Sequence, residues 1–150
     1  MNENPILLVE DNRGDEVLAL LAFKRCNVAN QVVVARDGED ALNYLRNPNN
    51  KLPTLILLDL KLPKASGLEV LRHVRTDERT KLVPVIVLTS SIQESDLRDS
   101  YTAGSNGYLH KSLDFNKFAE TIDAFSKYWL IYNETPRAAP GAVTAFYDRG

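Results

Sequence analysis

Short apolar runs alternate with amphipathic segments along the chain. The runs predict strands at 6–9, 32–35, 55–58, 85–88 and 107–110. The amphipathic segments predict helices at about 15–26, 38–46, 66–76, 94–103 and 115–132. Leu68, Leu71 and Val74 recur at spacings of three residues, which places them on one helical face. Ser91 and Glu94 have the spacing of a capping box, so a helix is expected to begin just after the fourth strand.

The apolar runs are too continuous for strands that have one face in water. Residues 6–9 and 55–58 contain no polar position, which is typical of parallel strands buried on both faces. Parallel strands need long crossovers, which are right-handed and usually helical. The predicted fold class is therefore α/β, a five-stranded parallel doubly wound sheet with helices on both faces and an extended last helix.

The last helix carries more apolar surface than one sheet needs. Its apolar residues alternate spacings of three and four and continue to Tyr132: Phe115, Phe118, Ile122, Phe125 and Trp129. A helix of this length spans roughly 27 Å, which exceeds a typical strand. Because exposed aromatic side chains mark interfaces, we expect a two-fold homodimer through Phe125, Trp129 and Tyr132.

The chain is expected to form one domain, residues 1–132, followed by a tail. Residues 133–150 are rich in alanine, glycine and proline, a composition that buries little surface. The tail is expected to be either flexible or an arm that orders on a partner, with Phe146 and Tyr147 as its only anchors. It is too short to form a DNA-binding fold.

Composition excludes several classes of partner. The chain of 150 residues has 18 basic and 20 acidic residues, a formal charge of −2, scattered without a basic stripe. We therefore expect neither nucleic-acid nor membrane binding. Cys26 is the single cysteine, no leader precedes Ile6, and no apolar stretch approaches the length of a membrane span, so a cytoplasmic protein is expected.

Charged and hydroxyl side chains follow the predicted strands. The first strand is followed by Glu10 and Asp11, the third by Asp59, the fourth ends near Thr89, and the fifth is followed by Lys111. The carboxyl ends of parallel strands share one edge, where α/β sheets carry their chemistry. Three carboxylates are hard oxygen ligands suited to Mg²⁺. A carboxylate beside Mg²⁺ and a lysine can act as a nucleophile towards phosphorus and form an aspartyl phosphate.

These motifs as a set resemble the receiver domain of response regulators, which has a flavodoxin-like fold. The resemblance covers about residues 5–130 and lies in Val9-Glu10-Asp11-Asn12, Asp59-Leu60-Lys61-Leu62-Pro63-Lys64-Ala65-Ser66-Gly67, Val87-Leu88-Thr89 and Tyr108-Leu109-His110-Lys111.

The resemblance implies a role for each matching residue. Asp59 would be the phosphoacceptor, and Glu10, Asp11 and the backbone carbonyl of Lys61 would hold Mg²⁺ with it. Thr89 would be the switch hydroxyl and Lys111 the phosphate-binding lysine. Tyr108 would be the switch aromatic, and the surface of 94–103 with 107–110 would change on phosphorylation.

One position departs from the family. Its lysine is usually followed by a proline in a cis peptide bond, whereas Ser112 follows Lys111 here. A cis bond before a residue other than proline costs about 2.5–4 kcal/mol, so the loop is expected either to tolerate that strain or to change shape.

A narrower resemblance points to the single-domain regulators of bacterial and cyanobacterial phytochrome histidine kinases. It rests on Asp11-Asn12-Arg13-Gly14-Asp15, Asp37-Gly38-Glu39-Asp40-Ala41-Leu42, Leu88-Thr89-Ser90-Ser91 and Tyr128-Trp129. It implies a phytochrome-type histidine kinase as phosphoryl donor.

Three functions remain open from the residues. The first is a phosphorylatable switch that is no enzyme beyond weak autophosphatase activity. The second is a receiver-like interaction module that no longer needs phosphate. The third, a flavin carrier or phosphatase on the same fold, is disfavoured because Asn12-Arg13-Gly14-Asp15 replaces a glycine-rich phosphate loop.

Overall fold

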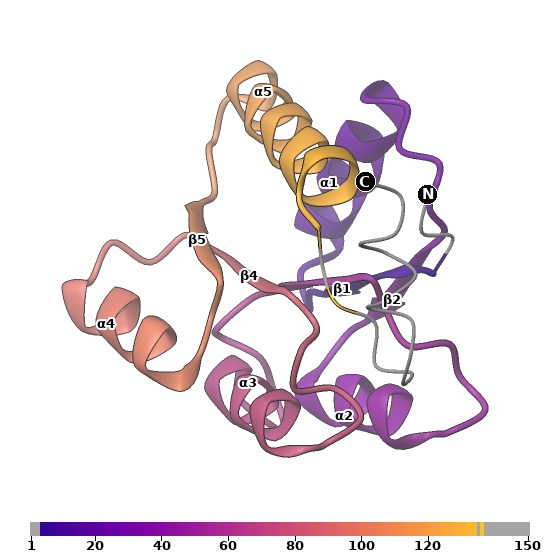
Figure 1. Cartoon of the computed structure of the whole chain (residues 1–150). Helices are drawn as coiled ribbons and strands as arrows, with labels where there is room; N and C mark the ends of the chain where they lie inside the picture. Colours follow the sequence, from indigo (N-terminus) through magenta and orange to yellow (C-terminus); the bar gives the residue numbers. More distant parts are fainter. Residues whose placement is uncertain (1–3, 135, 137–150) are drawn as a thin grey trace.

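Five parallel strands form one sheet in the computed structural model, which describes residues 4–134 and 136 (Figure 1). The strand order is β2-β1-β3-β4-β5. Their bounds are Ile6–Val9 for β1, Val32–Ala35 for β2, Leu55–Leu58 for β3, Val85–Thr89 for β4 and Gly107–His110 for β5. The prediction of a doubly wound parallel sheet is confirmed, and only β4 differs from its predicted range, by running on to Thr89.

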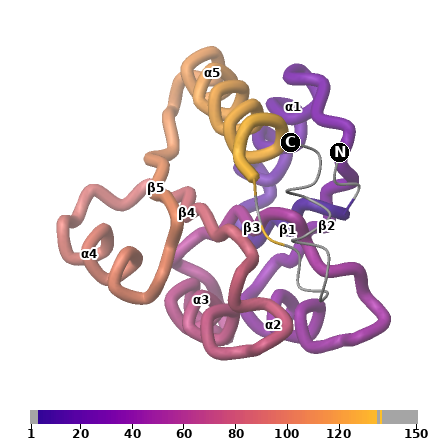
Figure 2. Tube along the Cα trace, viewed as in Figure 1, coloured from indigo at the N-terminus to yellow at the C-terminus, as the bar shows by residue number. Residues whose placement is uncertain are grey.

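Helices cover both faces of the sheet (Figures 1 and 2). Their bounds are Arg13–Arg25 for α1, Gly38–Arg46 for α2, Gly67–Thr76 for α3, Glu94–Ala103 for α4 and Phe115–Ser126 for α5. In both views α1 and α5 lie together on one side of the sheet, and α2 and α3 lie on the other. Helix α4 packs beside α3 and β5.

Two apolar clusters form the core, one on each face of the sheet. Alternate residues of β3 separate between them: Leu55 and Leu57 join α1 and α5, whereas Ile56 and Leu58 join α2 and α3. All four are 0–1% exposed, so the strand is buried on both faces. This alternation is why an unbroken apolar run is needed in the central strand.

Helix α1 begins two residues earlier than predicted because of its cap. Asn12 precedes it, and the Asn12 side-chain oxygen accepts a hydrogen bond from the Asp15 amide at 2.9 Å. An asparagine cap satisfies one of the amides that a helix start leaves without a partner. The same residue borders the charged edge of the sheet, so the cap also bears on the site.

The capping box predicted for α4 is wrong. Gln93 precedes the helix, and its side chain makes no capping hydrogen bond. The Ser91 hydroxyl instead donates to a carboxylate oxygen of Asp96 and accepts a hydrogen bond from the Gln93 amide. The spacing of Ser91 and Glu94 correctly located the start of the helix. The carboxylate that Ser91 contacts, however, belongs to Asp96 and not to Glu94.

The last helix does not remain α-helical to its end. Helix α5 ends at Ser126, and a π-helix, η1, continues from Lys127 to Tyr132. The Asn133 amide donates to the carbonyl of Tyr128, five residues earlier. A wider turn rotates the following side chains away from an α-helical stripe. The extended helix is present as predicted, but its single continuous face is not.

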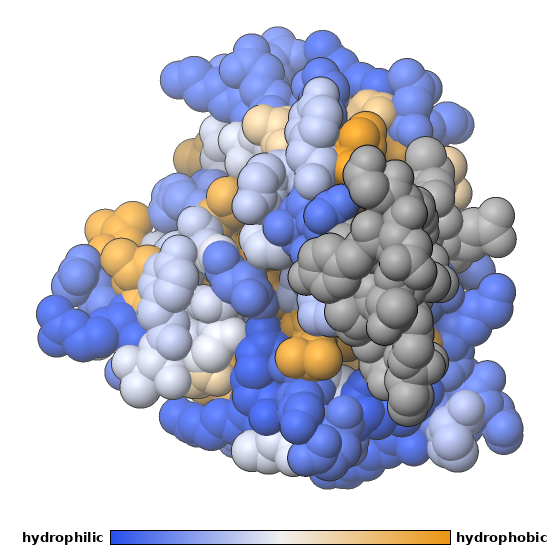
Figure 3. Space-filling view, in the orientation of Figure 1, coloured by the Kyte–Doolittle hydropathy of each residue, from blue (hydrophilic) through white to orange (hydrophobic). Residues whose placement is uncertain are grey.

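The three residues expected at a dimer interface therefore lie in different surroundings. Phe125 is 6% exposed and belongs to the core under α1, so placing it at an interface was wrong for this chain. Trp129 packs partly buried against the same cluster. Tyr132 is 71% exposed, and Tyr128 and Ile131 are exposed beside it. Elsewhere on the face in Figure 3 the surface is largely hydrophilic, with hydrophobic residues in small separate groups.

Arg75 is a structural residue that the sequence patterns did not identify. Its guanidinium donates to the carbonyls of Gly104 at 2.8 Å and Val83 at 2.8 Å, and to the side chain of Asn106. Burial lowers its pKa. The residue thus joins the end of α3 to the turn between α4 and β5.

We expect Arg75→Ala to lower the free energy of unfolding by about 2–4 kcal/mol, because several partly buried acceptors lose a charged donor. Urea unfolding followed by circular dichroism measures this. Arg72→Ala, on the exposed side of the same helix, serves as the control and is expected to change stability by less than about 0.5 kcal/mol. Equal losses of unfolding free energy in the two variants would contradict this structural role of Arg75.

The described part of the chain contains no helix long and apolar enough to cross a membrane. Most of the predicted tail, residues 133–150 with Phe146 and Tyr147, lies outside the described residues.

Candidate phosphoacceptor site

The sheet register brings the predicted residues to one edge. Val9 pairs with Leu58, so Glu10 and Asp59 leave neighbouring strands side by side. The Asp59 amide donates to the Val9 carbonyl at 3.0 Å, which fixes the start of the loop after β3. At the other side, the Lys111 amide donates to the Thr89 carbonyl at 2.7 Å and extends the β4–β5 pairing.

Three carboxylates cluster at this edge. Glu10, Asp11 and Asp59 each offer an oxygen, and the three oxygens lie within 4.8 Å of one another. Glu10 is 2% exposed and Asp59 is 8% exposed, whereas Asp11 is on the surface. Hard oxygen donors with one open side match Mg²⁺, which keeps several waters and accepts a phosphoryl oxygen. The donor set therefore fits the metal that the sequence indicated.

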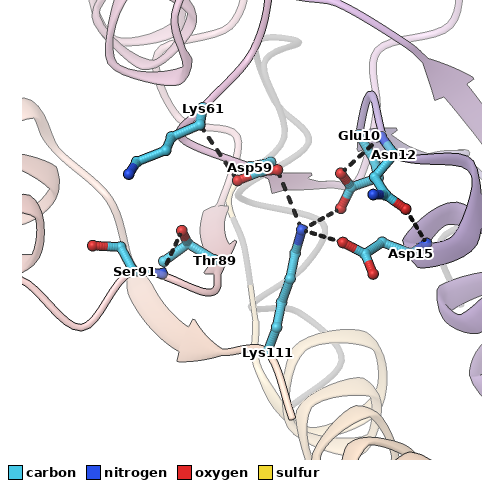
Figure 4. A network of polar contacts seen from close by, with 8 residues as sticks. All are labelled: Glu10, Asn12, Asp15, Asp59, Lys61, Thr89, Ser91 and Lys111. Atoms are coloured by element: carbon cyan, nitrogen blue, oxygen red, sulfur yellow. Dashed lines mark hydrogen bonds and ion pairs between the residues drawn. The ribbon is translucent and has the colours of Figure 1, made fainter. Parts of the chain in front are cut away.

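Lys111 lies at the centre of the acidic site (Figure 4). Its ammonium nitrogen is 2.7 Å from Glu10 Oε1, 2.9 Å from Asp15 Oδ2 and 3.2 Å from Asp59 Oδ2. The Lys111 side chain is only 14% exposed. A buried ammonium shared by three carboxylates offsets charges that would otherwise repel one another at close range.

Burial and charge change the pKa values of this pair. Burial raises the pKa of Glu10 to about 7, although Lys111 opposes the shift. For Lys111, burial would lower the pKa, but hydrogen bonds to Glu10 and Asp15 and the charge of Asp59 outweigh it and raise the pKa. Lys111 therefore stays charged throughout the ordinary pH range, and Glu10 is the group that titrates.

A dependence of stability on pH follows for the metal-free protein. The folded state holds the Glu10 proton more tightly than the unfolded state, whose pKa is near 4.5. The contribution is fully present below pH 4.5 and is lost as pH rises to about 7. In EDTA we expect the free energy of unfolding to fall by up to about 3 kcal/mol across this window.

Chemical denaturation at a series of pH values measures this fall. Glu10→Gln is the control, because an amide does not titrate, and it should flatten the profile in this window. A wild-type profile that is flat or rises between these pH values would contradict the raised pKa of Glu10.

The switch residues predicted from the resemblance lie beside this group. Thr89 is 1% exposed at the end of β4, and its hydroxyl accepts a hydrogen bond from the Ser91 amide at 3.2 Å. The Tyr108 hydroxyl is buried and makes no hydrogen bond within the described residues. Burial raises the Tyr108 pKa, and the charge of Asp96 adds to the shift. Thr89 and Tyr108 thus both approach the loop that begins α4.

Lys61 contributes its backbone to the site. Its amide lies 3.4 Å from Asp59 Oδ1, and its side chain points away from the Lys111 ammonium (Figure 4). The Asp59 carboxylate is therefore approached by a backbone amide at one oxygen and by an ammonium at the other.

The loop after Lys111 takes an ordinary backbone conformation. The Lys111–Ser112 peptide is trans, as are the other peptides of the described residues. Ser112 accepts a hydrogen bond from the Asp114 amide at 3.2 Å through its hydroxyl, and Asp114 caps α5. The strain of a cis bond is therefore absent here, and Lys111 still reaches the carboxylates.

Sequence reasoning missed two residues of the site, Asn12 and Asp15. The Asn12 backbone amide donates a hydrogen bond to Glu10 Oε2 at 3.3 Å, and the Asn12 side chain caps the helix that carries Asp15. The spacing of three between an asparagine and an acidic residue was a usable signal, because it places the acid in the first turn of a helix. Nothing in that spacing pointed to Lys111, which is 96 positions away from Asp15.

Comparisons with known proteins agree with this geometry. Residues 6–123 match the response regulator receiver domain. The chain is 42% identical over 137 residues to the probable methanogenesis regulatory protein FilR2 of Methanothrix harundinacea, covering 89% of this chain and 88% of that protein. It also superposes on two cyanobacterial-type regulators of known structure.

The first of these is the phosphorylated cyanobacterial phytochrome response regulator RcpA, with a TM-score of 0.82 and 38% identity over 90% of this chain and 99% of the other. The second is the Mn²⁺-bound form of response regulator Rcp1, with a TM-score of 0.82 and 35% identity over 89% and 99% of the two chains. The chain therefore belongs to the response regulator receiver domain family, and it resembles phytochrome response regulators.

Proposed function

We propose that this receiver domain is a phosphorylatable signalling switch and that Asp59 accepts the phosphoryl group from a histidine kinase. The observation that carries the proposal is the Lys111 ammonium, which lies 3.2 Å from Asp59 and 2.7 Å from Glu10 in one acidic cluster. A positive charge held beside a buried carboxylate is what phosphoryl transfer to that carboxylate requires.

In the proposed reaction an Asp59 carboxylate oxygen attacks the phosphorus of the donor phosphohistidine. A phosphorus–oxygen bond forms, the phosphorus–nitrogen bond breaks, and the imidazole leaves with its electron pair and takes up a proton. Lys111 donates hydrogen bonds to the oxygens that carry the developing charge. Attack by a carboxylate needs no general base, because a carboxylate carries no proton that must be removed.

Glu10, Asp11, Asp59 and the backbone carbonyl of Lys61 would hold Mg²⁺ in this proposal. When bound by these residues, the metal would supply two positive charges beside the phosphoryl oxygens. Support comes from the clustered carboxylate oxygens of this chain and from Rcp1, whose structure is described as Mn²⁺-bound.

The readout proceeds through Thr89. When the Thr89 hydroxyl turns towards a phosphoryl oxygen, the Ser91 amide loses its acceptor. The Ser91–Asp96 hydrogen bond and the buried Tyr108 hydroxyl lie next in line. The surface of α4 and β5 is thus the proposed output, and the chain acts as a switch with at most weak autophosphatase activity rather than as an enzyme.

Incubation with acetyl phosphate and Mg²⁺ tests the proposal. We expect intact-mass spectrometry to show one added phosphoryl group that hydroxylamine removes, as an acyl phosphate requires, and EDTA to prevent the addition. An unmodified protein after complete metal loading would reject the switch and favour the phosphate-independent interaction module.

A phytochrome-type histidine kinase is the proposed phosphoryl donor. The proposed location is the cytoplasm, where such kinase domains act on receivers. RcpA is named a phytochrome response regulator, and this chain is 38% identical to it. Purified phytochrome kinase labelled with radioactive phosphate should transfer its label to this chain within minutes. Transfer no faster than from an unrelated histidine kinase would reject this donor class. The similarity to FilR2 would then be the better guide to the donor kinase.

We further propose a homodimer through the exposed end of the last helix. Tyr128, Ile131 and Tyr132 are 53%, 64% and 71% exposed and adjoin one another in η1. Apolar side chains gathered in this way are usually covered by a partner. The interface is therefore narrower than the sequence stripe, since Phe125 belongs to the core.

Ile131→Asp is expected to convert a dimer into a monomer, because a charge would be buried at the centre of the contact. Sedimentation equilibrium at tens of micromolar protein measures the mass. Leu82→Asp, which changes an exposed leucine before β4, is the matched control and should leave the dimer intact. A monomeric wild-type protein would contradict the proposal.

A further inference from the structure

Asp15 is a fourth carboxylate at the site, and the proposed reaction has no role for it. Its Oδ2 accepts a hydrogen bond from Lys111 at 2.9 Å, which is shorter than the 3.2 Å contact between Lys111 and Asp59. The Asp15 side chain is 38% exposed, so it reaches the buried ammonium from the rim (Figure 4). The phosphoacceptor thus shares its cation with a residue outside the metal cluster.

The backbone holds Asp15 in this position. The Asn12 side chain caps α1 by accepting a hydrogen bond from the Asp15 amide. Asp15 lies in the first turn of the helix, where the helix dipole favours a carboxylate. The Asn12 amide also donates to Glu10. One residue therefore contacts both Glu10 and the turn that carries Asp15.

An ammonium has three protons, and all three are used here. Lys111 donates to Glu10 and Asp15 and approaches Asp59 as its third and longest partner. An incoming phosphoryl group needs one or more of those protons. Glu10 is nearly fully buried, whereas Asp15 lies at the rim, so the Asp15 contact is the one that solvent can replace.

The surroundings of the Asp15 contact allow that replacement. A cavity of about 20 Å³ lies beside the pair, lined by Asp15, Lys111, Ser112, Leu18, Leu88 and Phe118. A volume of this size holds about one water molecule. Lys111 can therefore exchange Asp15 for water without leaving the site.

We propose that Asp15 is a positioning residue that competes with the phosphoryl group for the Lys111 ammonium. In the unphosphorylated protein it draws the ammonium towards α1, and its negative charge makes the site more attractive to a divalent cation and less attractive to a phosphoryl anion. This inference rests on the proposed function of Asp59 as phosphoacceptor. Asp15 touches Lys111 and not the reacting atoms, so it acts through the lysine.

The variant Asp15→Asn tests the competition, because asparagine keeps the size and the first-turn position but removes the charge. We expect Mg²⁺ to bind about threefold more weakly, as measured by calorimetry, since one nearby negative charge is lost. At saturating Mg²⁺ we expect beryllofluoride, a phosphoryl analogue, to bind about threefold to tenfold more tightly, as measured by NMR titration. Both differences should shrink in high salt.

Two further variants make the test specific. Asp40→Asn changes the residue three positions after the cap of α2, as Asp15 stands three positions after the cap of α1, and should leave both affinities unchanged. Asp15→Glu keeps the charge and should restore wild-type affinities within about twofold. Opposite changes in the two affinities cannot come from a loss of folding, which would weaken both.

The outcomes separate the two hypotheses. Wild-type protein that neither takes phosphate from acetyl phosphate nor binds beryllofluoride would overturn the proposed function itself. Wild-type protein that binds normally, with Asp15→Asn equal to Asp40→Asn or weakened towards both ligands, would overturn the role of Asp15 alone.

Discussion

Asp59→Asn is expected to abolish phosphorylation by acetyl phosphate, by at least about 100-fold relative to wild type, because a carboxamide is not a nucleophile towards phosphorus. The change keeps the shape of the side chain, and Asp59 is only 8% exposed, so its neighbours remain packed. Its carbonyl oxygen can still accept a hydrogen bond from Lys111 or from the Lys61 amide.

The same substitution should not unfold the protein. It removes one of three clustered carboxylates and so lowers their mutual repulsion, which offsets the lost attraction to Lys111. Intact-mass spectrometry after acetyl phosphate treatment measures the phosphoryl group, and thermal unfolding measures the fold. Asp40→Asn on α2 is the control and should be phosphorylated as wild type. A phosphoryl group retained by the folded Asp59→Asn protein would place the acceptor elsewhere.

Lys111→Met is expected to have effects of opposite sign on metal binding and on phosphorylation. Lys111 contacts both Glu10 and Asp59, which are two of the three proposed carboxylate ligands. Without this competing cation, Mg²⁺ should bind more tightly, by about tenfold, because the site keeps its negative charge. Phosphorylation should fall by about 100-fold, because the charge that stabilises the transferring phosphoryl oxygens is gone.

Stability adds a third readout for Lys111→Met. In EDTA at pH 8 the free energy of unfolding should fall by about 3 kcal/mol, because buried carboxylates lose their counter-ion, and Mg²⁺ should restore most of it. Calorimetry, acetyl phosphate labelling and urea unfolding measure the three effects. Lys117→Met, on the exposed face of α5, serves as the control. Weaker Mg²⁺ binding in Lys111→Met would show that the lysine organises the metal site rather than competing with it.

The position of the central strand and its acid was readable from the chain because both follow from local pattern. Residues 55–58 are apolar without interruption, and the polar residue after them must emerge at the strand end. In the structure this strand is buried on both faces and Asp59 begins the loop beyond it. The same reasoning located Glu10 and Lys111, since parallel strands end at one edge.

The end of the last helix was not readable in the same way. Alternating spacings of three and four predict a single apolar face only if the helix stays α-helical. The π-helix from Lys127 to Tyr132 changes the turn, and packing of Phe125 against α1 draws it into the core. The burial of Phe125 depends on what α1 places opposite it, which the local sequence does not contain.

Local patterns were enough to predict the five strands, their order along the chain, and the side chains of Glu10, Asp59 and Lys111 at one edge of the sheet, because each follows from a few neighbouring positions. The folded chain was needed to see how Lys111 divides its contacts among Glu10, Asp15 and Asp59. It was also needed to see that Arg75 joins α3 to the turn before β5. These contacts join residues far apart in the chain. Their geometry is set by strand register and helix packing, which no local pattern contains.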